Sequence, residues 1–259
     1  MTTPFRYLDP RHLVRRRLAG RKPPKWDAAI LCFRDAPGTR ALMKYLRIQP
    51  VRHRIFWSSG RSRRPEVGVA RIGRFKVGVL GFLDWGGPQC AVMMEELGTL
   101  RIPMAIGYGA AGALVDHLPR GGQLAVHSAP AMDGTSRWYG KGMGRPDARL
   151  LSCARGAANA LGISMHSVRA ATTDAPYRET RRAVRAWLRS GAEVVNMESA
   201  AFYLSARACG VKALWLGHVS DRLLPGTWED WHDGRNNMTS QTARLCRETL
   251  RMALSGRRG

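Results

Sequence analysis

The chain has 259 residues, of which 44% are hydrophobic, so it is long enough to bury a substantial core within one domain. No run is apolar over the roughly 18 residues that a membrane-spanning helix needs, which argues against a membrane protein of the helical class. The N-terminal segment MTTPFRYLDPRHLVRRRL is polar and basic and contains no apolar stretch. We therefore expect no secretory signal, and we expect a cytoplasmic location.

The net charge of +23 is the most pronounced feature of the composition. A basic surface attracts phosphates, which allows nucleic-acid or membrane-surface binding, but arginines on a solvated surface or around an anionic substrate give the same total. The basic residues concentrate in the first third of the chain and are not interleaved with aromatic residues, as they are in single-strand-binding platforms. We therefore do not expect nucleic acid or a membrane to be the primary partner.

Five cysteines are scattered along the chain, at positions 32, 90, 153, 209 and 246, and no two form a Cys-x-x-Cys motif. This pattern is typical of small core residues in a cytosolic protein rather than of a disulfide framework or a zinc site. The seven histidines show no metal-ligand spacing either. We expect neither a metal site nor a bound cofactor.

Predicted strands alternate with predicted helices after a basic N-terminal arm, residues 1–25. The strands are expected at residues 28–33, 67–72, 75–80, 104–108, 123–127, 165–171 and 213–219. The helices are expected from the Pro/Gly turn at 34–40 through residue 46, and at 88–100, 147–161, 178–189, 197–209 and 237–254. No linker or internal repeat divides these elements. The order predicts one α/β domain, residues 1–259, with helices on both faces of a parallel or mixed sheet.

Residues 191–222 organise the rest of the chain. The sequence predicts a helix from Met197, with Asn196 as its N-cap and Gly210 as its C-terminal glycine. Glu198 then falls in the first helical turn, where the helix dipole favours an anion. An interior strand follows, and Asp221 is expected just beyond its carboxyl end, where open α/β sheets bind their ligands. Each acid alone is explained by capping or by a turn, but the pair together indicates a site.

The segment Asn-Met-Glu-Ser-Ala-Ala at 196–201, followed by Val-Ser-Asp at 219–221, resembles the signature of the nucleoside phosphorylase family. This family includes purine nucleoside phosphorylases, uridine phosphorylases and methylthioadenosine-type nucleosidases. The Gly-Gly-Pro turn at 86–88 and the Gly-Ala-Ala-Gly turn at 109–112 resemble two further site loops of the family, in the same order. The resemblance covers most of the chain and implies a three-layer α/β/α fold with a mixed central sheet.

The resemblance also implies roles for individual residues. Met197 and Glu198 would hold the ribose, and Asp221, assisted by Arg235, would protonate the departing base as a general acid. His12 and Arg54 would serve a neighbouring subunit, at its ribose and its phosphate respectively, which implies a homo-oligomer, either a dimer or a hexamer. Arg40 would bind phosphate beside the turn that contains Gly109 and Ala110. For His12 and the three arginines, an ordinary surface role is an equal alternative.

Two expected phosphate ligands are missing. The phosphorylases carry an arginine two residues before the glycine turn and a Ser or Thr after its first glycine, whereas this chain has Gly107 and Ala110. Either other arginines hold phosphate or the nucleophile is water. In the hydrolytic members an acid after the first strand activates water, and Asp35 stands near that position, although the preferred interpretation of Asp35 is a turn residue.

The sequence therefore predicts an enzyme that cleaves the N-glycosidic bond of a purine-like nucleoside or nucleotide. Phosphorolysis, with phosphate as co-substrate, is the first hypothesis, and hydrolysis is the alternative. The aromatic wall of the base site is expected from Tyr177 or Trp85. A non-catalytic nucleotide-binding or nucleic-acid-binding relative remains a further alternative.

Overall fold

The computed structural model describes residues 6–52, 55–56, 67–224, 227–230 and 235–256, without the side chains of 235–237. The helices are α1 (Pro10–Leu18), α2 (Ala36–Tyr45), α3 (Gly87–Thr99), α4 (Ala148–Leu161), α5 (Arg181–Arg189), α6 (Ser199–Ala208) and α7 (Arg235–Ser255), with short 3₁₀ helices η1 (Ser136–Trp138) and η2 (Pro176–Arg178). The strands are β1 (Ala28–Cys32), β2 (Gln49–Pro50), β3 (Val67–Ile72), β4 (Phe75–Leu80), β5 (Met104–Ala113), β6 (Gln123–Pro130), β7 (Met143–Gly144), β8 (Met165–Thr172), β9 (Val194–Asn196), β10 (Lys212–Leu224) and β11 (Thr227–Glu229).

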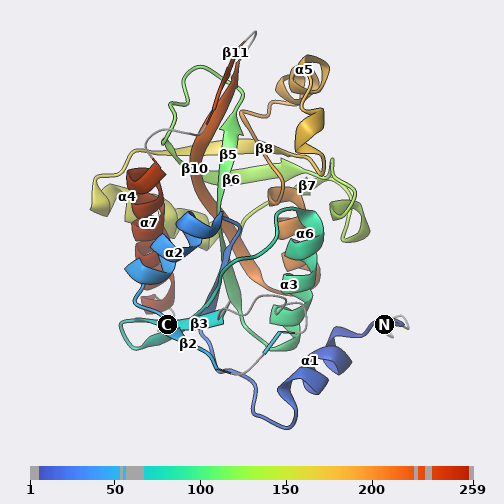
Figure 1. The fold of residues 1–259 in the computed structure, drawn as a ribbon, viewed down its shortest axis with the longest axis vertical. Coiled ribbons are helices and arrows are strands. Elements are labelled where there is room, and N and C mark those ends of the chain that lie inside the picture. The colour runs from blue at the N-terminus through green and yellow to red at the C-terminus, as the bar shows by residue number, and fades with distance from the viewer. Residues whose placement is uncertain (1–5, 53–54, 57–66, 225–226, 231–234, 257–259) are drawn as a thin grey trace.

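A mixed sheet runs through the centre of the molecule (Figure 1). β5 pairs in parallel with β1 on one side and with β10 on the other. From β10 the pairing continues through β6, β8 and β9, and β9 returns to β5 as an antiparallel neighbour. These strands close a circuit that begins and ends at β5, while β1, β4, β3 and β2 extend the sheet away from it. The predicted mixed sheet is confirmed.

Helices cover both faces of the sheet, as predicted. One buried cluster joins the sheet to α2, α4 and α7 through residues such as Leu42, Leu150 and Leu250. The cluster on the other face includes Val14, Met93 and Phe202, from α1, α3 and α6. In Figure 1 the first set of helices lies to the left of the strands and α3 and α6 lie to the right. Burial of apolar side chains from both helical layers is the main source of stability in such an arrangement.

Two central strands are longer than predicted. The expected end of a strand at Tyr108 and the turn at 109–112 are both wrong, because β5 continues to Ala113. Its small residues let β10 and β9 pair closely on either side of it. The expected end at Val219 is also wrong, because β10 passes through a register shift between Val219 and Asp221 and continues to Leu224 as one arm of a hairpin with β11.

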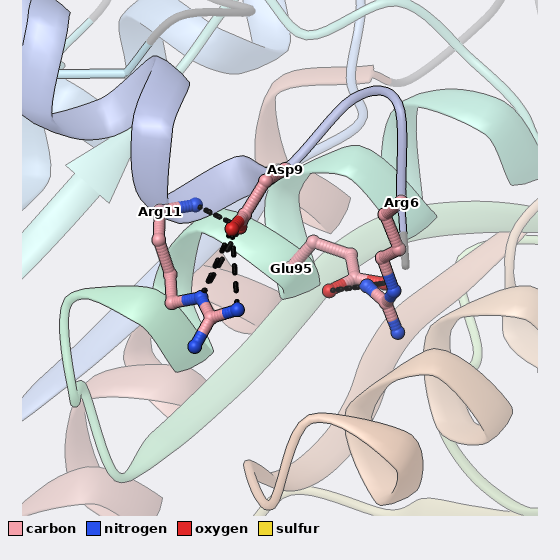
Figure 2. Close-up of polar contacts among 4 residues, drawn as sticks. All are labelled: Arg6, Asp9, Arg11 and Glu95. Carbon is pink, nitrogen blue, oxygen red and sulfur yellow. Dashed lines mark hydrogen bonds and ion pairs between the residues drawn. The ribbon is translucent and has the colours of Figure 1, made fainter. Parts of the chain in front are cut away.

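The described part of the N-terminal arm is docked rather than free. The helical turn predicted around His12 is the nine-residue helix α1, whose buried Val14 and Leu18 belong to the cluster that includes α3. Asp9 caps α1 by accepting from the backbone N–H of Arg11, and Arg6 forms an ion pair of 2.9 Å with Glu95 of α3 (Figure 2). A cavity of about 830 Å³ lies between the arm, α3 and the C-terminal end of α6.

All five cysteines are free thiols, and three of them are buried, as expected for small core residues. Within the described part of the chain, no helix has both the length and the apolar character needed to cross a membrane.

Candidate active site

Glu198 lies at the junction between β9 and α6. The predicted start of this helix is off by two residues: α6 begins at Ser199, which makes Glu198 its N-cap residue. Asn196 nevertheless organises the junction, because its Oδ1 accepts from the N–H of Ser199 at 3.2 Å and its Nδ2 donates to the Ser199 hydroxyl at 2.6 Å. The Asn196 side chain therefore fixes the turn from which the Glu198 carboxyl projects.

The Glu198 side chain is 4% exposed and is oriented by the Gly-Gly-Pro loop. Its Oε1 accepts from the N–H of Gly86 at 3.1 Å. Burial raises the pKa of Glu198 to about 7, and the hydrogen bonds from the N–H groups of Gly86 and Met197 oppose this increase. Glu198 is thus a buried carboxyl group that the backbone of the Gly-Gly-Pro loop orients.

The raised pKa of Glu198 predicts a pH-dependent effect of Glu198→Gln on stability. Because the folded state favours the neutral carboxyl, wild-type stability is full below the ordinary pKa of 4.5 and declines as the pH rises through about 7. Glutamine lacks this titration. From pH 5 to pH 8 the variant should therefore gain roughly 2–4 kcal/mol in unfolding free energy relative to wild type.

Urea unfolding at the two pH values measures this difference. Glu248→Gln is the control, because the ion pair with Arg251 lowers the pKa of Glu248 from 4.5, so its contribution is constant between pH 5 and 8. A stability difference for Glu198→Gln that does not change with pH would contradict the buried, neutral carboxyl.

Asp221 lies on β10 immediately after the register shift. Its Oδ1 accepts from the Ser220 hydroxyl at 2.5 Å, and its Oδ2 accepts from the indole Nε1 of Trp228, on β11, at 3.1 Å. Both donors are near neighbours in the hairpin, so the hairpin itself orients the carboxyl group.

The pairing of the central strands relates Asp221 to Glu198. Gly112 on β5 pairs with Asp221 on one side and with Val195, three residues before Glu198, on the other. A Cβ at Gly112 would lie 3.5 Å from Asp221 Oδ2 and 2.4 Å from a Leu223 methyl carbon, so this position accepts only glycine without rearrangement. The sheet therefore places Asp221 of β10 and Val195 of β9 on opposite sides of the same β5 residue, and the chain continues from β9 through Met197 to Glu198.

Asp221 faces a cavity of about 810 Å³ between α5 and the β10–β11 hairpin. Tyr177 and Trp228 supply aromatic rings at its wall, and Glu179 supplies a second carboxyl group. Burial raises the pKa of Glu179 to about 7, and the charge of Asp221 raises it further. The cavity thus combines aromatic surface with two interacting acids, a composition suited to a planar heterocycle with polar edges.

Met197 and Trp85 line a separate cavity of about 600 Å³, beside the Gly-Gly-Pro loop. Of the two aromatic residues predicted for the base site, only Tyr177 shares a cavity with Asp221. The Tyr177 side chain is fully exposed and that of Trp85 is 61% exposed, so both are free to contact a ligand. Their roles at the base stay predictions.

The predicted nucleophile side is tightly packed. The buried indole of Trp215 packs on Gly107 and Gly109, which lie two positions apart on β5. A Cβ at Gly107 would lie 2.7 Å from the ring, and a Cβ at Gly109 would lie 2.5 Å from it. The indole Nε1 is buried and has no hydrogen-bond partner within the described residues. The phosphorylase arginine at position 107 would thus collide with Trp215. Ala110 pairs with His218 of β10 and is half-buried.

Asp35 and Arg40 lie on or next to α2. Asp35 is the N-cap residue, and its Oδ1 accepts from the N–H of Gly38 at 3.0 Å, as a helix-capping aspartate does. Arg40 is exposed. Arg34, directly before Asp35, was not singled out from the sequence. Its side chain is 13% exposed, and its Nε is buried without a hydrogen-bond partner in the described part of the chain.

For three of the predicted residues, the described structure shows no side chain at the site. His12 is exposed on α1, consistent with a role toward another subunit, which stays a prediction. Arg54 lies outside the described residues. Arg235 begins α7, and its side chain is outside the described part of the structure.

Sequence reasoning missed Glu179, Trp228 and Trp215. Glu179 precedes α5 and reads as an ordinary residue before a helix N-cap, because its partner Asp221 is 42 positions away. Trp228 lies on the short strand β11, which nothing in the local sequence pattern indicates. The glycines at 107, 109 and 217 were the available signal for Trp215, because a row of glycines in adjacent strands indicates a bulky group lying on them.

Comparison with known proteins identifies the family. The sequence model of the Phosphorylase superfamily matches residues 40–251. The chain belongs to the phosphorylase superfamily. Members of this superfamily are nucleoside phosphorylases and nucleosidases, which bind nucleosides and cleave their N-glycosidic bond. The resemblance noted in the sequence is thereby confirmed.

Solved structures share the fold at low sequence identity. An AMP nucleosidase from Bacteroides thetaiotaomicron is 18% identical, with a TM-score of 0.75 over 96% of this chain and 100% of that chain. A uridine phosphorylase from Vibrio fischeri, complexed with 6-hydroxy-1-naphthoic acid, is 16% identical, with a TM-score of 0.70 over 86% of this chain and 90% of that one. The superfamily fold is therefore retained over most of the chain.

Proposed function

We propose that this protein cleaves the N-glycosidic bond of a purine-like nucleoside or nucleotide, with Asp221 as general acid and Glu198 as the ribose ligand. The observation that carries the proposal is the pairing of Gly112 with both Asp221 and Val195, which sets Asp221 and the strand that leads to Glu198 on the two sides of β5. Asp221 faces a cavity with aromatic walls, and Glu198 is buried and oriented by Gly86. The two carboxyl groups thus have different surroundings, as the two halves of a nucleoside require.

The chemistry assigns each acid one task. As the bond between C1′ and the base nitrogen breaks, its electron pair moves to the base, and the proton of Asp221 neutralises that charge. Glu198 accepts hydrogen bonds from the 2′- and 3′-hydroxyls, and its charge stabilises the positive, oxocarbenium-like sugar. The nucleophile forms the new C1′–O bond, and a proton lost by water restores Asp221 to its acid form.

Water is the nucleophile that the packing supports best. Phosphate carries two negative charges and needs several donors, and the position of one family arginine is occupied by the Trp215 ring. Ala110 offers no hydroxyl group in place of the second ligand. A hydrolytic nucleosidase needs neither group.

Phosphorolysis is the second candidate, and Arg34 is the observation that favours it. The Arg34 guanidinium follows β1, and its Nη2 lies 3.6 Å from Asp35 Oδ1. Burial lowers the pKa of His218, on β10, to about 3, and the positive charge of Arg34 lowers it further. A cation with an unpartnered, buried N–H is suited to an anionic co-substrate.

Base release from a panel of nucleosides and nucleotides, each assayed with and without phosphate, tests the proposal. We expect release at the same rate in both conditions, with free ribose or ribose 5-phosphate as the second product. Release that requires phosphate and yields ribose 1-phosphate would establish phosphorolysis instead. No release from any substrate would contradict the enzyme and favour a binding role for nucleotides or, if salt-sensitive DNA or RNA binding is found, for nucleic acid.

A further inference from the structure

The outward side of α5 carries a row of arginines. Arg181, Arg185 and Arg189 recur every fourth residue, so they follow one another along one side of the helix. Arg182 lies beside this row, and Arg178 lies in η2 just before the helix. All five side chains are exposed, and we call these five residues the arginine face. From residue 181 to residue 189 it is about 12 Å long, a length that spans several phosphates of a nucleic-acid strand.

No acid neutralises the arginine face. Among the residues that the structure describes, none of its five arginines forms an ion pair, whereas Arg222 and Arg251 are paired with Glu229 and Glu248. Glu179 is the single acid between positions 178 and 189 of the sequence, and it is half-buried in the wall of the cavity that Asp221 faces. The arginine face therefore presents concentrated positive charge to solvent.

The opposite side of α5 packs against the sheet. Trp187 is buried in a cluster with Ala171 of β8 and Val195 of β9, and Val184 and Leu188 pack against the same cluster. Helices that lie on a membrane need an apolar side to insert among the lipids. The apolar side of α5 is used within the fold, so the arginine face fits a soluble anionic polymer better than a bilayer.

Exposed aromatic rings lie beside these arginines. Tyr177 directly precedes Arg178 and is fully exposed, and Trp228 on β11 is 56% exposed. Both rings line the cavity between α5 and the hairpin, and so do Arg181 and Arg185. In Figure 1, α5 stands beside the tip of this hairpin. The fold thus brings together basic and aromatic residues, the combination on which proteins bind the backbone and the bases of a single strand.

We propose that α5 and the adjoining cavity wall bind single-stranded nucleic acid, with the arginine face on successive phosphates and with Tyr177 and Trp228 stacked on bases. This inference goes beyond the proposed function and does not depend on it, because binding a strand requires no cleavage of a glycosidic bond. Stacking requires unpaired bases, so a duplex should bind more weakly. The carboxyl groups of Glu179 and Asp221 favour bases over anionic lipid, because base amino groups donate hydrogen bonds whereas lipid phosphates repel carboxylates.

Fluorescence anisotropy with a labelled single strand of mixed sequence, about 12 nucleotides long, tests the proposal over a series of salt concentrations. DNA and RNA of the same sequence would both be measured. The test variant is Arg182→Gln/Arg189→Gln, because neither arginine lines the cavity. We expect its affinity to fall roughly 10-fold and the slope of log affinity against log salt to decrease by about 1.4, or about 0.7 for each lost phosphate contact.

Arg244→Gln/Arg247→Gln is the matched control, because it removes the same charge from exposed positions on α7. The control should bind the strand almost as wild type does. Base release from free nucleosides should be the same in both double variants and in wild type. Strand binding without base release would therefore contradict the proposed function and leave this inference intact.

Tyr177 tests the stacking contact separately. Tyr177→Leu should weaken binding of the single strand by roughly 5- to 100-fold, because the ring that stacks on a base is lost. Tyr177→Phe keeps the ring and should retain the affinity. Binding of the annealed duplex should change little in either variant.

Three results would overturn the proposal. Equal weakening by the two double variants would mean that the overall charge, and not α5, attracts the strand. Equal affinity for the strand and its duplex, or an unchanged affinity in Tyr177→Leu, would exclude stacking. Binding to phosphatidylserine vesicles that is lost in Arg182→Gln/Arg189→Gln, without binding of the oligonucleotide, would make the arginine face a membrane-binding surface instead.

Discussion

Asp221→Asn is expected to lower kcat for base release by roughly 10²- to 10⁴-fold, with little change in KM. Asparagine has nearly the same size and can still accept a hydrogen bond from Trp228. It has no acidic proton, so the base would have to depart as an anion. The loss should therefore fall on the chemical step and not on binding.

A substrate whose leaving group needs no proton gives the sharpest test. A 4-nitrophenyl riboside should be cleaved by Asp221→Asn at a rate close to that of wild type, because nitrophenolate departs without protonation. Asp116→Asn is the matched control: Asp116 is 85% exposed and contacts Arg222, the residue after Asp221. Equal loss on the nucleoside and on the nitrophenyl riboside would show that Asp221 does not act as the general acid.

Glu198→Ala is expected to reduce kcat/KM for a ribonucleoside by roughly 10²- to 10³-fold, since a buried, charge-assisted pair of hydrogen bonds to the sugar is lost. The effect should be much smaller for the 2′,3′-dideoxynucleoside, which has neither hydroxyl group. The two changes form a double-mutant cycle between protein and substrate. If the carboxyl group and the hydroxyl groups bind each other, removing both should lower kcat/KM little more than removing either one.

Glu193→Gln provides the control for Glu198. Glu193 directly precedes β9, and its carboxylate also accepts from a backbone N–H, that of Arg169, at 3.2 Å. The Glu193→Gln substitution should change the turnover of the ribonucleoside and of the dideoxynucleoside by the same factor. If Glu198→Ala also impaired both substrates to the same extent, Glu198 would be a structural residue of the Gly86 loop and not a ribose ligand.

The order of the elements was predictable from the sequence because the individual signals are local. The strands at 67–72 and 75–80 are separated by the glycine at position 73, a local turn signal, and in the structure they form a hairpin in which Gly73 has a left-handed φ of 60°. Strand ends were less predictable. Whether β5 stops at Tyr108 depends on β9 and β10, which pair with residues 109–113 from distant parts of the sequence.

The candidate site was predictable only in part, because some of its contacts join residues that are far apart in the sequence. Glu198 and Asp221 stood out because each lies beside a clear local pattern, a helix start and a buried strand, and because the motifs resemble a known family. Glu179 carries no local signal, since its interaction with Asp221 depends on tertiary structure. The packing of Trp215 on Gly107 is also tertiary, although the missing arginine at that position pointed to a changed nucleophile site.

The closed circuit of strands from β5 through β10, β6, β8 and β9 has a mechanical consequence. A closed circuit has no free edge from which hydrogen bonds can unzip, so amide hydrogens of β5 should exchange with solvent only through global unfolding. Asp221 is part of this ring, and α5 packs against its outside through the buried indole ring of Trp187. A ligand that enters the cavity between α5 and the hairpin therefore meets one wall, the strand that carries Asp221, whose position is fixed by the ring.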